Sequence, residues 1–312
     1  MLRTVLAVAA LLLVIAGAAA AAWIYPHLAW PDEPDEVIAA RWAQVDAWAA
    51  PAPGFEAPTA NLRRALDRLQ ASELRGYTGK EPLAGPAALD DAAREALAEL
   101  IAWSDAGGGL GGERCVAGLQ DPTFPAVRAL ALARVALHGA DGPDAPQVGA
   151  ALRLGDALRA RGGLLLGLIG FAIADEARAT ALRLTWPKSQ VFAAHRPRRD
   201  QVFPLLAREA YCQATEIEAL SGQEGALDPG GARSALVSME RELAVLRWYE
   251  GQRLVALARV RGDLGALARA LAEPPPPPKS LLVPTLTTAP DLSDLEAEIA
   301  AYDAYVDAPA AR

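Results

Sequence analysis

Residues 164–174 read Leu-Leu-Leu-Gly-Leu-Ile-Gly-Phe-Ala-Ile-Ala, an uninterrupted apolar segment that ends at Asp175 and Glu176. A helix that is apolar on every side lies either in the centre of a helical protein or in a membrane. As a helix this segment would be about 17 Å long, well short of a bilayer core of about 30 Å. It therefore predicts the central helix of a water-soluble core.

Small residues recur through this region at intervals of three or four positions: Gly163, Gly167, Gly170 and Ala174. A Gly within a helix costs about 1 kcal/mol relative to Ala. Close contact with a neighbouring helix backbone would offset that cost. Glycines that are incidental in an Ala/Leu-rich sequence would bring no such contact, and the sequence leaves both interpretations open.

The residues before this segment predict its partner helix. Residues 147–161 place apolar residues at helical spacing, with Arg159 and Arg161 among the charged positions between them. This pattern is typical of a helix with one buried face and one solvated face. Because Gly162-Gly163 separates the two predicted helices, we expect them to form a hairpin.

The composition argues against a sheet-based fold. Of the 312 residues, 52% are hydrophobic in type but only 6% are aromatic, because Ala and Leu supply most of the apolar count. No long run alternates apolar and polar residues as a half-buried strand would. We therefore expect an all-α fold over residues 32–272, an irregular multi-helix bundle built from helical hairpins.

Residues 1–31 have the features of a membrane anchor. The stretch from Thr4 to Tyr25 is uncharged and almost wholly apolar, and as a helix it would reach about 33 Å, enough to cross a bilayer. Arg3 precedes it, and acidic residues follow from Asp32. The positive-inside rule then predicts a single-pass protein of the cytoplasmic (inner) membrane, with the bulk of the chain extracytoplasmic.

A cleaved signal peptide is the alternative interpretation of this leader. Residues 5–15 would serve as its apolar region, and the small residues at 18–22 offer cleavage sites. The apolar run continues through Trp23, Ile24 and Tyr25, which favours an uncleaved anchor. Cleavage would make the protein periplasmic or secreted.

The C-terminal part is expected to be distinct from the main bundle. Residues 273–290 contain consecutive prolines and predict a semi-rigid, extended linker. Residues 291–312 predict an amphipathic helix. Its apolar side holds Leu295, Ile299, Tyr302 and Val306. This is a candidate interaction helix for another protein, although docking on its own domain is the favoured interpretation.

The charge argues against nucleic acid as a partner. A net charge of −8 gives no general attraction to a duplex or to an anionic lipid surface. The basic sequence from His195 to Arg199 is a local exception. Its Pro197 predicts a loop, and the sequence is too short for a nucleic-acid site, so we interpret it as a solvated loop.

Cys115 and Cys212 are the two cysteines of the chain. In an exported protein such a pair favours a disulfide. Closing a loop of about 98 residues would stabilise the fold by about 4 to 5 kcal/mol in the chain-entropy model. Two buried free thiols are the alternative. The flexible Gly-rich run expected at residues 107–112, just before Cys115, favours the disulfide.

The sequence offers few catalytic side chains. Its three histidines do not occur in the HExxH or ExxH spacing of metal sites, and no Gly-x-Ser-x-Gly elbow is present. The Gly-rich run lacks the preceding strand and the Lys of a phosphate-binding loop. We expect no metal and no cofactor. Glu73 is the one weak catalytic candidate, as the general acid of a polysaccharide-cleaving enzyme.

The longest helical pattern runs from residue 232 to residue 260. Glu250 and Arg253 interrupt its apolar positions on either side of Gly251. This interruption predicts a break in the helix, which would divide its packing seam into two parts.

Two stretches of the chain carry a family resemblance. The run from Leu158 to Leu165, which continues through residues 168–173 into Ala177, and the run from Leu257 to Gly262 resemble a loose group of signal-anchored, all-helical bacterial proteins. The resemblance would cover residues 124–272 and implies a helical extracytoplasmic domain. Because no activity is established for this group, it implies no site residue.

These observations favour a non-enzymatic, membrane-anchored, extracytoplasmic protein that acts as a scaffold or through contacts with a protein partner. A cell-wall polysaccharide-cleaving enzyme that uses Glu73 is one alternative. A carrier of lipid or of another apolar ligand is a second alternative, and it would need a cavity beside residues 164–174.

Overall fold

The computed structural model describes residues 33–80, 83, 85–111, 115, 126–223, 239–272 and 292–308. Within these ranges the chain is all-helical and has no β-strand. The predicted leader and the predicted Pro-rich linker lie outside the described residues. Among the described helices, none combines the length and the apolar character needed to cross a bilayer.

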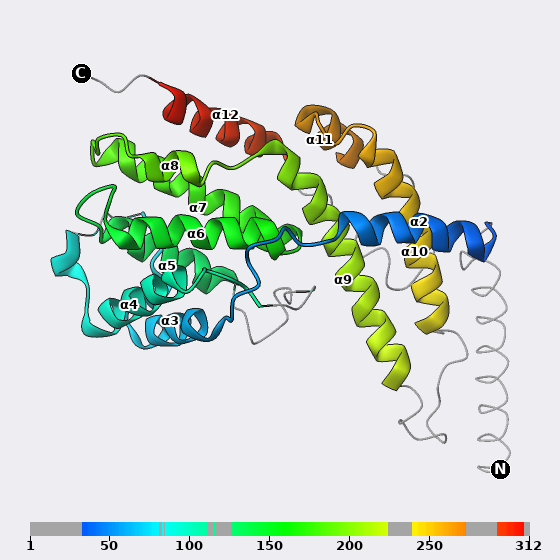
Figure 1. The fold of residues 1–312 in the computed structure, drawn as a ribbon, viewed down its shortest axis with the longest axis horizontal. Coiled ribbons are helices and arrows are strands. Elements are labelled where there is room, and N and C mark those ends of the chain that lie inside the picture. The colour runs from blue at the N-terminus through cyan, green and yellow to red at the C-terminus, as the bar shows by residue number, and fades with distance from the viewer. Residues whose placement is uncertain are drawn as a thin grey trace, which may run out of the picture.

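The helices form a lobe and an arm (Figure 1). The lobe contains α3 (Ala60–Ala71), α4 (Asp91–Asp105), α5 (Ala126–His138), α6 (Pro146–Arg161), α7 (Leu164–Arg183) and α8 (Gln190–Ala194), with short 3-10 turns η2 (Glu73–Gly76) and η3 (Gly85–Ala88). The arm contains α2 (Asp35–Trp48), α9 (Val202–Gln223) and α10 (Met239–Ala258), and the turn η4 (Arg199–Gln201) leads into it. Each unit has its own buried apolar cluster.

The predicted hairpin is confirmed as α6 and α7, and α7 is central to the fold. It packs against α5, α6, α9 and α12. Phe171, Ile173 and Ala174 are buried, but Leu165 is 37% exposed. The apolar segment is therefore a core helix that is buried on most of its sides rather than on all of them.

The glycines of the hairpin allow close contact between backbones. A Cβ added to Gly170 would lie 2.5 Å from the carbonyl oxygen of Gly155, and one added to Gly155 would lie 3.0 Å from the carbonyl oxygen of Gly170. A Cβ on Gly167 would lie 2.2 Å from Leu205 of α9. The close-contact interpretation therefore holds, since α6 and α9 approach α7 at its glycines.

Residues 108–110 are buried, contrary to the expectation of a flexible Gly-rich run at residues 107–112. The indole of Trp103 donates to the carbonyl of Gly109 at 2.8 Å. A Cβ on Gly109 would lie 2.2 Å from the backbone nitrogen of Ala57. Gly109 is needed here because it lies directly against the backbone of Ala57.

The predicted break in the longest helix is wrong, because α10 continues through Gly251. Glu250 and Arg253 are both buried and form an ion pair at 3.1 Å within the helix. A Cβ on Gly251 would lie 3.1 Å from the side chain of Arg41. Gly251 therefore lets α2 approach α10. The buried charges of Glu250 and Arg253 neutralise each other within the helix, so they do not interrupt it.

The C-terminal helix α12 (Ser293–Asp307) lies against the rest of the chain (Figure 1). Leu295, Ile299 and Tyr302 are buried, and the Tyr302 hydroxyl donates to the carbonyl of Phe192 in α8 at 2.9 Å. Val306 is partly buried against the apolar cluster of the lobe. The apolar side of the candidate interaction helix is therefore covered by α7, by α11 (Leu264–Ala272) and by the lobe.

Cys115 and Cys212 form a disulfide in the structure, with Cα atoms 5.5 Å apart. Cys212 belongs to α9 of the arm, and Cys115 belongs to the connection between α4 and α5 of the lobe. The disulfide therefore ties the lobe to the arm.

We expect Gly170→Ala to lower the free energy of unfolding. The added methyl meets a backbone oxygen that cannot move without separating α6 from α7, and overpacking of this kind costs about 1 to 3 kcal/mol. Chemical unfolding followed by circular dichroism measures the loss.

Gly149→Ala is the matched control, because a Cβ at this position of α6 would lie 3.6 Å from Val191, an ordinary contact. It should be neutral, or stabilising by about 1 kcal/mol through helix propensity. Equal effects of the two substitutions would contradict the close contact.

Candidate functional site

A cavity of about 630 Å³ lies where the lobe meets the arm. Its walls come from the end of α6, from α8, from the chain between α8 and α9, from the start of α9 and from the linker after α2. Small or apolar residues, mainly alanines with Phe55 and Pro204, form part of the lining. The charged lining residues are Asp156, Arg159, Arg196, Arg198, Asp200 and Arg208. We refer to this cavity as the basic pocket.

Arg159 is a buried member of the basic pocket, with 1% of its surface exposed, and its Nε has no hydrogen-bond partner among the described residues. Its guanidinium donates to the carbonyl of Gly170 at 2.5 Å and to that of His195 at 3.3 Å. It also forms an ion pair with Asp156 one turn earlier. Burial lowers the pKa of Arg159 even though the Asp156 carboxylate acts in the opposite direction.

Arg208 reaches the pocket from α9 and is also buried, with 2% exposure. It donates to the carbonyl of Ala160 and, at 2.9 Å, to that of Arg159. These carbonyls belong to the last turn of α6, where the helix dipole is negative. Burial, together with the positive charge of Arg161, lowers the pKa of Arg208 to about 10. Among the described residues, no carboxylate forms an ion pair with Arg208.

Arg161 adds a second buried positive charge beside Arg208. It is 2% exposed, and its guanidinium lies 3.7 Å from the carboxylate of Glu56. That carboxylate is itself about half exposed. Arg161 and Arg208 therefore place two buried positive charges near each other at the carboxyl end of α6.

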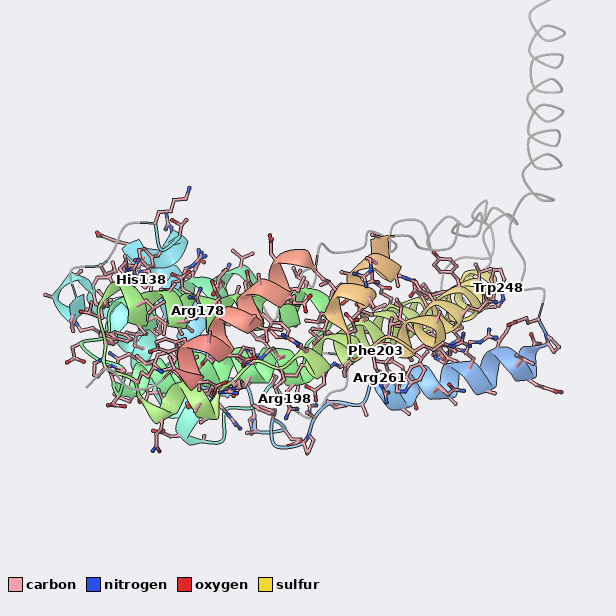
Figure 2. The ribbon with its side chains drawn as sticks, turned by 90° about the horizontal axis from the view of Figure 1, so that it is seen from above. His138, Arg178, Arg198, Phe203, Trp248 and Arg261 are labelled. Atoms are coloured by element: carbon pink, nitrogen blue, oxygen red, sulfur yellow. A yellow bond between two sulfur atoms is a disulfide. The ribbon has the colours of Figure 1, made fainter. Side chains whose placement is uncertain are left out.

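The rim of the basic pocket carries more exposed charges. Arg198 forms an ion pair with Asp200 at 3.1 Å, and its side chain is 66% exposed. Arg196 forms ion pairs with Asp303 and Asp307 of α12. Figure 2 shows Arg198 at the junction between the lobe, which contains His138, and the arm, which ends near Trp248.

Four arginines and two aspartates line the basic pocket, and two further aspartates, Asp303 and Asp307, pair with Arg196 from outside the lining. Sequence reasoning missed the pocket for two reasons. It assigned Arg159 and Arg161 to a solvated helix face, and it interpreted the loop of Arg196 and Arg198 as merely solvated.

A second, shallower hollow of about 400 Å³ lies between α2, α9 and α10, and we refer to it as the arm groove. Its larger side chains are Trp42, Tyr211 and Arg247. The Arg247 guanidinium lies 5.9 Å from the centre of the Trp42 ring and pairs with Glu218 at 3.1 Å. Trp, Tyr and Arg are the residues that dominate the binding energy of protein interfaces.

A polar cluster around His138 occupies the far end of the lobe (Figure 2). Its Nδ1 pairs with the Tyr77 hydroxyl, and its Nε2 lies 3.0 Å from Glu176. Burial acts to raise the pKa of Glu176, but the hydrogen bond with His138 and the charge of Arg134 outweigh it, so the pKa is lowered. Since both ring nitrogens are engaged and the ring is buried, the cluster fixes the loop of Tyr77 to α5 and α7.

The weak catalytic candidate Glu73 lies at the start of η2 and is exposed. Its backbone N–H donates to Asp90 at 2.8 Å. It lies outside both the basic pocket and the arm groove. In the described part of the chain, no group of three or more His, Cys, Asp or Glu side chains could hold a metal ion.

No protein-family model, curated protein or solved structure matches this chain. The residues of the basic pocket and of the arm groove are therefore the basis for inferring a function.

We expect Asp156→Asn to lower the free energy of unfolding by about 3 kcal/mol, because it removes the counter-ion of the buried Arg159 charge and weakens the contact with His195. Asp175→Asn is the matched control. Asp175 also pairs with an arginine three residues later, Arg178, but both of these side chains are more exposed than that of Arg159.

Loss of the control pair should cost less than about 1 kcal/mol. Denaturant unfolding of both variants at low and high salt measures the difference. Similar small losses for Asp156→Asn and Asp175→Asn would show that Arg159 is not held as a buried charge.

Proposed function

We propose that this chain is a membrane-tethered, extracytoplasmic helical protein that acts by binding a partner protein through its arm. The arm groove, in which Tyr211 and Arg247 are partly exposed beside the largely buried Trp42, is the observation that carries the proposal. Such a combination of aromatic and arginine side chains is typical of the centre of a protein interface.

The proposed location is the outer face of the cytoplasmic membrane. Its support is the leader sequence, in which Arg3 precedes a long apolar run and acidic residues follow from Asp32. The disulfide between Cys115 and Cys212 supports the same location, because disulfides persist in exported proteins and are rare in the cytosol.

The arm is the part of the described chain that follows the leader most directly. Its first helix, α2, begins at Asp35, only a few residues after the predicted anchor. A partner in or near the same membrane would therefore meet the arm before it met the lobe. In contrast, the apolar side of α12 is covered by the chain itself, so we assign the partner contact to the arm groove rather than to Leu295, Ile299 and Tyr302.

The alternatives from the sequence receive less support. Glu73 is exposed and lies outside both cavities, whereas a general acid with a raised pKa needs a sheltered site. A carrier for an apolar ligand would need space beside residues 164–174. There, Gly167 and Gly170 are in close contact with α9 and α6.

Site-specific photocrosslinking of the full-length chain in intact cells tests the proposed contact. Ala39 and Thr215 are exposed and line the arm groove. A benzophenone side chain at either position should give a discrete crosslinked product in the membrane fraction. The same probe at Asp67, an exposed residue of α3 in the lobe, is the control.

Tyr211→Ala should reduce the yield from the Ala39 probe by about tenfold, as expected for a side chain at the centre of an interface. A product of equal yield at all three probe positions, or no product at the arm positions, would contradict the proposal. Recovery of the chain from the cytosol would contradict the proposed location.

A further inference from the structure

We propose that His138 is a proton-operated switch between two partners on α7. Its neutral ring binds Arg183, and its protonated ring binds Glu176 and releases Arg183. The switch lies in the lobe and does not depend on the partner contact at the arm groove. If the chain has the location proposed above, the switch responds to the pH outside the cytoplasm.

A single nitrogen of the buried His138 ring faces two partners with opposite requirements. Its Nε2 lies 3.0 Å from a carboxylate oxygen of Glu176 and 3.0 Å from a guanidinium nitrogen of Arg183. A carboxylate only accepts hydrogen bonds, and a guanidinium only donates them. Nε2 can therefore bind Glu176 only when it carries a proton, and it can bind Arg183 only when it does not.

The neutral ring favours Arg183, because Glu176 has another donor. Arg134 of α5 donates to the second carboxylate oxygen of Glu176 at 3.3 Å. Arg183 also donates to the Thr180 hydroxyl, but this bond is weak because it is 3.4 Å long. When Nε2 has no proton, the ring proton is on Nδ1, which donates it to the hydroxyl oxygen of Tyr77.

Protonation of the ring reverses this preference. It adds a third positive charge, beside those of Arg134 and Arg183, around the carboxylate of Glu176. Nε2 then donates to Glu176 and repels the guanidinium of Arg183. The Tyr77 hydroxyl stays uncharged, because burial raises its pKa, and it accepts from Nδ1 in both states. Histidines change charge between about pH 5 and 8, so this exchange falls within the physiological range.

The ring of His138 is held in place, whereas Arg183 can move. His138 is 2% exposed, and a Cβ on Gly79 would lie 3.3 Å from its Cε1. The Tyr77 ring also packs edge-on against it, with 5.3 Å between the ring centres. Arg183 is an exposed residue at the end of α7. The charge repulsion is therefore relieved by movement of the arginine side chain into solvent.

Histidine-selective nitrogen NMR of the full-length chain in neutral detergent tests this inference, because the ring nitrogens report both tautomer and charge. The chain has three histidines, His27, His138 and His195, and His138→Gln identifies the signals of His138. We expect the Nδ1–H tautomer of His138 at about pH 8 and the doubly protonated ring at about pH 5. Unchanged signals of His195, which pairs with Asp156, show that a variant is folded.

Arg183→Met should convert the high-pH tautomer of His138 to the Nε2–H form, because Glu176 is then the partner left to Nε2. Glu176→Gln removes the charge that stabilises the protonated ring, so His138 should gain its proton about one pH unit lower than in the unsubstituted chain. Arg178→Met and Asp175→Asn are the matched controls, since they change an arginine and a carboxylate of α7 that pair with each other. Both should leave the signals of His138 unchanged.

An Nε2–H tautomer of His138 at high pH in the unsubstituted chain would overturn the inference. So would a high-pH tautomer that Arg183→Met leaves unchanged, or a ring that stays neutral down to about pH 5. Crosslinking at the arm groove is independent of these outcomes, so failure of this inference can be distinguished from failure of the proposed function.

Discussion

The backbone contact between α6 and α7 at Gly155 and Gly170 is the constraint on which the rest of the structure depends. It brings the two helices so close that neither glycine can carry a larger side chain without displacement. The stem of Arg159 lies across Gly170, and its guanidinium binds the carbonyl of that residue. The contact therefore fixes both the core of the lobe and the innermost charge of the basic pocket.

The carboxyl end of α6 connects this core to the arm. Its last carbonyls accept hydrogen bonds from Arg208 of α9, and the backbone N–H of Ala52, in the linker after α2, donates to Ala160 at 3.2 Å. The negative end of the helix dipole makes these carbonyls favourable partners for a buried guanidinium. One helix end thus joins three parts of the chain, and its carbonyls offset part of the cost of burying the Arg208 guanidinium.

Much of the helical framework could be predicted from the sequence, because the spacing of apolar residues and the capping residues that define a helix lie within or next to that helix. The apolar run at 164–174 predicted the central helix. Asp263 is a local cap of the same kind, since it accepts a hydrogen bond from the N–H of Ala266 in the first turn of α11 at 2.9 Å. The basic pocket could not be predicted, because α9 covers a helix face that periodicity assigns to solvent. Gly251 was misinterpreted for a similar reason: it allows the approach of α2, a contact between residues far apart in the chain.

The two hollows have different linings. Trp42, Tyr211 and Arg247 are the larger side chains of the arm groove, whereas charged side chains from several elements line the basic pocket. The central claim beneath both is that a close helix pair buries arginines at the junction of lobe and arm. Side-chain nitrogen NMR of the arginines tests it most directly, through the exchange rate of each Nε–H with water. The Nε–H of Arg159 should exchange far more slowly than that of the exposed Arg63, and equal rates would contradict the account.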